Sequence, residues 1–123
     1  MAGKRVQDVS LGLRIRPRIY RGGDIALGPG KVDLLEAIAA TGSITRAAGQ
    51  LGMSYMRAWT LVKTMNRCFE APLVLASRGG QHGGRAQLTR NGREVLALYH
   101  RLTAESLRAS RPFWQRIRRR MKS

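Results

Sequence analysis

Two short groups of polar side chains have the types and spacing that phosphate recognition requires. The first contains Ser43, Thr45 and Arg46, and the second contains Ser54 and Arg57. Serine is a favoured helix N-cap, because its oxygen accepts a hydrogen bond from a backbone N–H of the first turn. The N–H groups that remain free at a helix start attract phosphate, helped by the helix dipole. We therefore expect both groups to begin helices that can hold a polyanion.

The arginines in these groups stand at an unusual position. A helix selected only for stability often carries Glu or Gln at its third position, where this chain has Arg46 and Arg57. A cation in the first turn opposes the helix dipole by about 0.3–1 kcal/mol. A bound phosphate would reverse the sign of that interaction. The alternative is that both arginines are ordinary solvated side chains, which cost little.

The elements that would position these groups form a helix-turn-helix over residues 42–69, a stretch without any acidic residue. Crossing helices need small residues at their contact and a tight turn between them, and this stretch supplies both. The predicted crossing contains Ala47, Ala48, Gly52 and Ala58, and the predicted buried stripe contains Leu51, Met53, Leu61, Val62, Met65 and Phe69. The opposite face of the second helix carries Tyr55, Met56, Arg57, Trp59, Thr60, Lys63 and Arg67. The alternative is an ordinary solvated helix pair.

Composition limits the classes of function. The chain has 123 residues, enough for one domain, and 23 Lys and Arg against 7 Asp and Glu give a formal net charge of +16. Such an imbalance destabilises a compact chain unless a polyanion relieves it, so nucleic acid is the expected partner and an anionic membrane surface the rival. Catalysis is not expected, because His82, His100 and Cys68 are isolated and the acids are scattered. We expect no cofactor, metal or small-molecule ligand.

The sequence also predicts where the protein resides. It has no run of roughly eighteen apolar residues and no continuous apolar segment near its N-terminus. A single cysteine, expected to be buried or half-buried, fits a reducing compartment. We expect a cytoplasmic protein with no membrane association.

The first third of the chain predicts a strand, a turn and a helix. Apolar residues alternate with arginines over residues 11–16, the period of a half-exposed strand, until Pro17 interrupts it. Residues 21–24 predict a turn, and a short apolar piece follows at residues 25–27. Pro29 suits the first turn of a helix that ends at Thr41, with Gly42 able to adopt a left-handed cap.

A hairpin is predicted behind the helix-turn-helix. Residues 73–78 and 85–88 have strand character, whereas the glycine-rich residues 79–84 are expected to form neither strand nor helix. A hairpin in that place would be a wing, and the alternative is a mere connecting loop. Gln81, His82 and Arg85 of the wing could reach a minor groove or a row of phosphates.

A long last helix is predicted after Thr89. Val95, Leu98, Tyr99 and Leu102 follow helical spacing, and Ser106, Ala109 and Phe113 continue that face. An exposed apolar stripe on a terminal helix is most simply covered by a second copy of the chain. Pro112 predicts a kink or the end of the helix. We therefore expect an arm at residues 1–10, a domain with its dimerisation helix at 11–111 and a basic tail at 112–123.

The segments GSI, MSY-x-x-AW, MNRCF, GG-x-x-GG and LT-x-x-G, in this order, resemble the DNA-binding domain of ModE-type, molybdate-responsive regulators. The resemblance covers roughly residues 11–102 and implies a winged helix-turn-helix related to that of LysR-type regulators. It implies a homodimer on an operator with two half-sites, with dimer contacts from the first and last helices. It also implies a recognition helix that presents Ser54, Tyr55, Met56, Arg57, Thr60 and Lys63, and a wing from Arg78 to Arg85. The chain leaves no room for molybdate-binding domains, so any effector sensing would need an unknown partner.

These inferences give one fold and two hypotheses of function. The fold is mainly α with a small β component, a winged helix-turn-helix with a long C-terminal helix for dimerisation. The first hypothesis is a sequence-specific regulator of transcription bound to double-stranded DNA. Ser43, Thr45, Arg46 and Ser54 would contact phosphates, and Tyr55, Met56, Arg57 and Thr60 would meet base edges, although Arg57 could equally hold a phosphate. The second hypothesis is a basic nucleoid- or ribosome-associated protein that binds nucleic acid without sequence preference.

Overall fold

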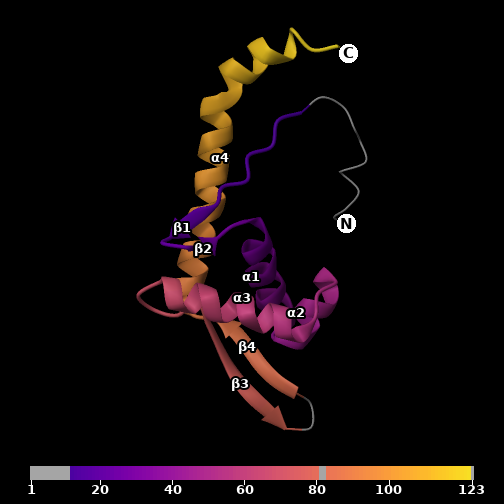
Figure 1. Cartoon of the computed structure of the whole chain (residues 1–123), viewed down its shortest axis with the longest axis vertical. Coiled ribbons are helices and arrows are strands. Elements are labelled where there is room, and N and C mark those ends of the chain that lie inside the picture. Colours follow the sequence, from indigo (N-terminus) through magenta and orange to yellow (C-terminus); the bar gives the residue numbers. More distant parts are fainter. Residues whose placement is uncertain (1–11, 81–82, 123) are drawn as a thin grey trace.

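The computed structural model describes residues 12–80 and 83–122, and for residues 78–80 and 83 only the backbone. The helices α1 (Pro29–Thr41), α2 (Ile44–Leu51) and α3 (Tyr55–Cys68) form a body, as Figure 1 shows. The hairpin of β3 (Val74–Gly80) and β4 (Gly83–Leu88) projects from one end of this body, and α4 (Arg90–Arg118) extends in the other direction. A second, short hairpin pairs β1 (Ile19–Arg21) with β2 (Asp24–Leu27). The predicted mainly helical winged helix-turn-helix with a long last helix is confirmed.

The core lies where the three helices of the body meet the root of the β3–β4 hairpin. Leu34, Leu35 and Ile38 of α1 are fully buried, as is Met65 of α3. The contact between α2 and α3 is made by small side chains, as predicted, because Ala47 and Ala58 are both 0% exposed and allow close approach of the two backbones.

Two glycines set the connections between these helices. Gly42 ends α1 at φ 72°, and Gly52 ends α2 at φ 69°. Both are in the left-handed region, where a residue with a Cβ is strained. The chain can therefore turn sharply enough to bring α1, α2 and α3 together over few residues.

The root of the β3–β4 hairpin is tied to both α3 and α4. The Asn66 Oδ1 of α3 accepts hydrogen bonds from the backbone N–H of Leu73 (2.8 Å) and Val74 (3.2 Å), and its Nδ2 donates to the Val74 carbonyl (3.0 Å). On the other side, Thr89 Oγ1 donates to the Pro72 carbonyl over 2.7 Å. Gly92 of α4 passes so close that an added Cβ would overlap the Leu73 carbonyl oxygen. The hairpin is thus positioned by two helices.

The predicted strand at residues 11–16 is wrong within the described part of the chain, where residues 12–18 pair with no strand. Leu13, Ile15 and Pro17 are nevertheless half-buried and alternate with exposed neighbours. This segment follows α4 (Figure 1), and the Tyr99 hydroxyl donates to the Pro17 carbonyl over 2.7 Å. Alternate side chains of this segment are thus half-buried without any strand pairing, and the paired strand starts only at Ile19. Leu11 lies outside the described residues.

The glycine-rich segment also differs from the prediction. The strands continue through Gly79 and Gly80 and resume at Gly83 and Gly84, with Gly80 paired to Gly83. Ladder hydrogen bonds are made by the backbone, so glycines can extend a hairpin that longer-range pairing has already set in register. The ladder is irregular between Ser77 and Gly80, as expected where glycine interrupts a strand.

The last helix begins as predicted and runs further than predicted. The Thr89 Oγ1 accepts a hydrogen bond from the Gly92 N–H over 2.8 Å, and the helix then continues to Arg118. Pro112 lies inside it, so this residue does not end the helix. A proline removes one helical hydrogen bond and is accommodated by bending, and α4 bends towards its C-terminal end in Figure 1. The first part of the expected tail, residues 112–118, is therefore helical.

Candidate nucleic-acid interface

The starts of α2 and α3 have the predicted caps. The Ser43 Oγ accepts a hydrogen bond from the Arg46 N–H over 3.1 Å, and the Ser54 Oγ accepts one from the Arg57 N–H over 3.0 Å. Neither first turn contains an acidic residue. Each serine uses one N–H of its turn and leaves the first ones free. Thr45 and Arg46 at the start of α2 and residues 54–57 at the start of α3 are exposed, so both ends keep the positive end of the helix dipole available to an anion.

The outer face of α3 is exposed along its first two turns. Met56 is 65% exposed and Tyr55 48%, and Arg57, Thr60 and Lys63 are exposed with them. The Thr60 Oγ1 donates to the Met56 carbonyl over 2.9 Å, which leaves its lone pairs free to accept. A helix with this face enters a major groove with its first residues nearest the base edges. The predicted recognition residues of α3 are thus accessible together.

Trp59 occupies the border of this face. It is half-buried against the core, as the sequence predicted, and the Lys63 Nζ lies 6.0 Å from the centre of its ring. A cation near an indole face is attracted by the ring quadrupole. Trp59 therefore anchors α3 to the body and also holds Lys63 on the exposed side.

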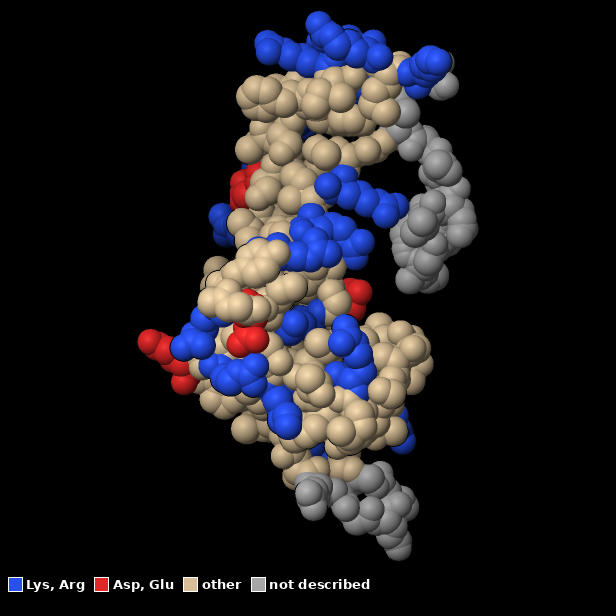
Figure 2. All heavy atoms as spheres, viewed as in Figure 1, with Lys and Arg blue, Asp and Glu red and all other residues tan. Residues whose placement is uncertain are grey.

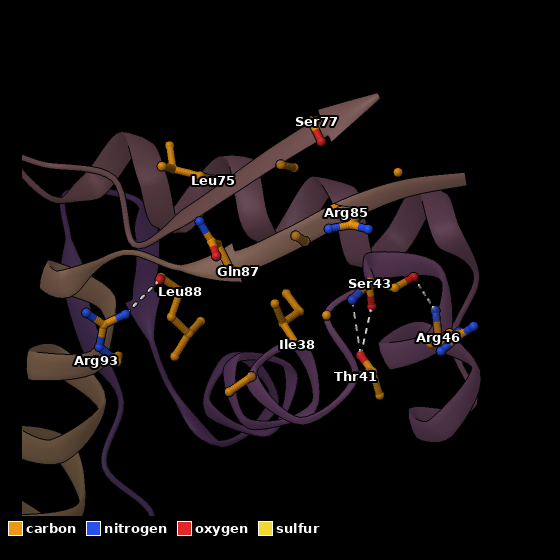
Figure 3. Close-up of a pocket in the computed structure, with 15 residues that line it drawn as sticks. Ile38, Thr41, Ser43, Arg46, Leu75, Ser77, Arg85, Gln87, Leu88 and Arg93 are labelled. Atoms are coloured by element: carbon orange, nitrogen blue, oxygen red, sulfur yellow. Dashed lines mark hydrogen bonds between the residues drawn. The ribbon is translucent and has the colours of Figure 1, made fainter. Parts of the chain in front are cut away.

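A cleft of about 940 Å³ separates the β3–β4 hairpin from the end of α1 and the start of α2. The Ala86 N–H donates to the Gly42 carbonyl over 2.9 Å, which places β4 against the α1–α2 turn. Figure 3 shows Arg85 of β4 above Ser43, with Arg46 further along the same cleft. None of the described residues that line the cleft is acidic. The structure thus brings the Ser43–Arg46 group and one predicted wing residue into a single cationic recess.

The remaining wing predictions cannot be placed in the same way. Gln81 and His82 lie outside the described residues, as does the side chain of Arg78. Thr45 is exposed in the first turn of α2, one residue from Arg46. The described part of the predicted interface therefore consists of the two helix starts, the outer face of α3 and Arg85.

Two cations near these groups were not predicted from the sequence. Lys31 occupies the third position of α1, as Arg46 and Arg57 do in their helices, and applying the same rule to α1 would have identified it. Its pKa is lowered first by burial and then by the nearby Arg57 guanidinium. Arg93 lines the cleft at the other end, where its Nη1 donates to the Leu88 carbonyl over 3.2 Å.

The ion pairs of the described residues lie away from this surface. Arg67 pairs with Asp24 over 3.3 Å, Arg90 pairs with Glu94, and the His100 Nε2 lies 2.6 Å from a Glu36 oxygen. None of these pairs includes Arg46, Arg57, Lys63 or Arg85, whose charges stay available to an external anion. Among the described residues, no cluster of His, Cys, Asp and Glu could hold a metal ion. No helix in the same part of the chain combines the length and hydrophobicity that a bilayer crossing needs.

Comparison with known proteins agrees with this geometry. Residues 30–93 match the family described as bacterial regulatory helix-turn-helix protein, lysR family. The chain is 44% identical over 79 residues to the molybdenum-pterin-binding protein MopA of Rhodobacter capsulatus, covering 64% of this chain and 30% of that protein. It is 45% identical over 80 residues to the molybdenum transport protein ModE of Azotobacter vinelandii, covering 65% and 30%. It is 35% identical over 92 residues to the DNA-binding transcriptional dual regulator ModE of Escherichia coli (strain K12), covering 75% and 33%.

These matches span about a third of the length of the curated relatives. By name, these three relatives are a pterin-binding protein, a transport protein and a transcriptional regulator rather than enzymes.

Proposed function

Because the chain belongs to the lysR family of bacterial regulatory helix-turn-helix proteins, we propose that it regulates transcription by binding a specific sequence of double-stranded DNA. The observation that carries this proposal is the exposed start of α3. There a capped helix end, the Arg57 guanidinium and the side chains of Tyr55 and Met56 face outward together. Backbone N–H groups position a duplex through its phosphates, and side chains of such a face read base edges.

The division of roles follows from position. Ser43, Arg46 and Arg85 line the recess between the hairpin and the start of α2 and carry hydroxyl and guanidinium groups suited to phosphates. Ser54, Thr45 and Lys63 also contact the phosphate backbone of the DNA. Tyr55, Met56, Arg57 and Thr60 meet base edges, and Arg57 pairs with guanine, a contact that discriminates by about 1–3 kcal/mol. The wing adds Arg78, Gln81 and His82 to the phosphate contacts.

The regulator acts as a homodimer on two half-sites. On α4, Leu98 is 66% exposed, Leu102 42%, Phe113 64% and Ile117 58%, and their spacing places them on one side of the helix. We name these four residues the α4 stripe. An exposed apolar stripe along one side of a helix is most simply buried against its own copy around a two-fold axis. Two recognition helices related by that axis bind half-sites about one helical turn apart.

The experiment is a selection of bound duplexes from a random pool, followed by titration of the selected duplex against salt. We expect one enriched motif with two-fold symmetry, bound about 10³-fold or more tightly than random sequence. With about six to eight phosphate contacts per half-site, the log–log slope against salt should approach 0.9 per contact. A pool that shows no enrichment would instead support the second hypothesis, which the high net charge of +16 favours. A slope near zero would contradict both.

A further inference from the structure

The C-terminal end of α4 carries a dense group of cations that the proposed operator contacts do not use. Arg116, Arg118, Arg119, Arg120 and Lys122 are all exposed, and we name them the distal basic cluster. Figure 2 shows them gathered at the end of α4 remote from the hairpin. The chain has no acidic residue after Glu105, and the ion pairs of the described part of α4 end with Arg108 and Glu105.

Helix stability does not account for this cluster. The helix dipole favours a cation in the last turn, where Arg116 and Arg118 stand. However, Arg119 is the C-cap and Arg120 and Lys122 lie beyond the last helical residue, so the dipole accounts for only part of the cluster, and like charges this close in sequence repel one another. The Arg120 Nη1 donates to the Arg116 carbonyl over 3.3 Å, which occupies one guanidinium nitrogen only. An external polyanion would turn this repulsion into attraction.

The cluster lies too far from α3 to share a straight duplex with it. The 29 residues of α4 correspond to a helix about 43 Å long at 1.5 Å per residue. Figure 1 places α3 and the hairpin at one end of the molecule and the end of α4 at the other. Duplex DNA is stiff over such distances, because its persistence length is about 150 base pairs. A duplex that crosses α3 and the hairpin at their end of the molecule would therefore have to bend sharply to reach the cluster of the same copy.

We propose that the distal basic cluster binds the phosphate backbone of a second duplex, so that the protein bridges two DNA segments. Exposed arginines on one helix end suit phosphates and carry no arrangement for reading bases. This binding is therefore independent of sequence and strongly dependent on salt. The neighbouring Phe113 and Ile117 would favour an anionic membrane instead, but they belong to the α4 stripe that the dimer covers. The bridging rests on the proposed binding of the first duplex at α3.

The test measures capture of a second duplex. A short duplex that carries the selected sequence is fixed to beads and saturated with the full chain, and a labelled duplex of unrelated sequence is then added. The variant replaces Arg116, Arg118, Arg119 and Arg120 with Gln, a good helix former. The control replaces Arg21, Arg90, Arg101 and Arg108 with Gln, which removes the same charge from exposed positions elsewhere. Circular dichroism checks that both variants keep their helix content.

We expect the wild type and the control to capture the labelled duplex. The cluster variant should bind the first duplex within about threefold of wild type, but lose at least about tenfold of the capture, since each lost phosphate contact removes about 0.9 from the log–log salt slope. Equal losses in both variants would show a mere effect of net charge and overturn the proposal. So would a cluster variant that still captures, or one that loses affinity for the first duplex to the same extent. If no protein binds even the first duplex, the proposed function itself fails.

Binding of the same variants to vesicles of anionic lipid tests whether the distal basic cluster binds a membrane surface instead of a second duplex. We expect weak binding that the cluster variant shares with the control. Tight vesicle binding that only the cluster variant loses, together with no capture of a second duplex, would assign the cluster to a membrane surface and overturn the bridging.

Discussion

The body and α4 treat apolar surface in opposite ways. In the body, Leu34, Leu35 and Ile38 are fully buried within one copy of the chain. In α4, only Gly92 and Tyr99 are buried, and the α4 stripe remains exposed. The body therefore buries its apolar side chains within one copy of the chain, whereas α4 leaves the four apolar side chains of its stripe exposed to solvent. Substitutions of buried residues should therefore change the stability of the chain, and substitutions of exposed residues should change what the chain binds.

The largest expected effect tests the closed packing of the body. Alanine in place of helical glycine ordinarily stabilises by about 0.5–1 kcal/mol, and we expect that gain for Gly49→Ala, where an added Cβ meets nothing within 4 Å. Gly92→Ala should instead cost about 3 kcal/mol, because the Cβ would overlap the backbone of Leu73, which cannot give way as a side chain can. Urea unfolding of both variants measures the difference. Equal stability of the two would mean that α4 is not pressed against the hairpin root.

The second effect tests the exposed α4 stripe. Replacing Leu102 and Phe113 with Gln removes two apolar side chains from the α4 stripe, each worth about 1.5–3 kcal/mol when buried. The dimer dissociation constant should therefore rise at least about a hundredfold, as measured by sedimentation equilibrium. The monomer should keep its stability, since both side chains are exposed within one copy. Leu35→Ala is the matched control, expected to destabilise the body by about 2–5 kcal/mol. An unchanged dimer would place the interface elsewhere.

The third effect distinguishes two similar helix starts within the body. Arg57→Ala should change which base is preferred at one position of the selected site, with a loss of about 1–3 kcal/mol on the favoured sequence. Arg46→Ala should weaken binding to all sequences alike and lower the log–log salt slope by about 1. Titrations against the selected duplex and single-base variants of it measure both. The opposite pattern would exchange the roles of the two arginines.

The smallest effect concerns the hydrogen bond that the Tyr99 hydroxyl of α4 donates to the Pro17 carbonyl. Tyr99→Phe should cost about 0.5–1.5 kcal/mol, the net value of a hydrogen bond. Burial raises the pKa of Tyr99 above its usual 10.0, so the unfolded chain loses this proton first as pH rises. The wild type should hence lose stability as pH rises above 10, through the folded pKa, and the Phe variant should lose less. Urea unfolding across this pH range checks the expectation, and parallel curves for the two proteins would contradict it.

Local signals predicted much of the fold and of the site. The Ser43 and Ser54 caps and the left-handed Gly42 and Gly52 depend on a few neighbouring residues, and the structure has all of them. The alternation at residues 12–18 misled because an unpaired segment can bury alternate side chains in the same way as a half-exposed strand. The glycines of the hairpin misled because pairing between distant strands outweighs their local preference.

Other features depend on contacts between residues distant in sequence and could not be predicted from neighbouring residues. The contact of Gly92 with Leu73 arises only when α4 docks on the hairpin root, and nothing in the neighbouring sequence indicates it. The same holds for the cleft that brings Arg85 beside Ser43, which are 42 positions apart in the sequence. Lys31 is different, since its position in α1 repeats the pattern of Arg46 and Arg57.

The amide of Asn66 has a mechanical consequence. From α3, it accepts hydrogen bonds from the backbone N–H groups of Leu73 and Val74, while Thr89 at the start of α4 donates to the carbonyl of the neighbouring Pro72. Any tilt of α4 relative to the body would strain these shared hydrogen bonds, so the end of α3, the root of the hairpin and the start of α4 are expected to move as one rigid unit.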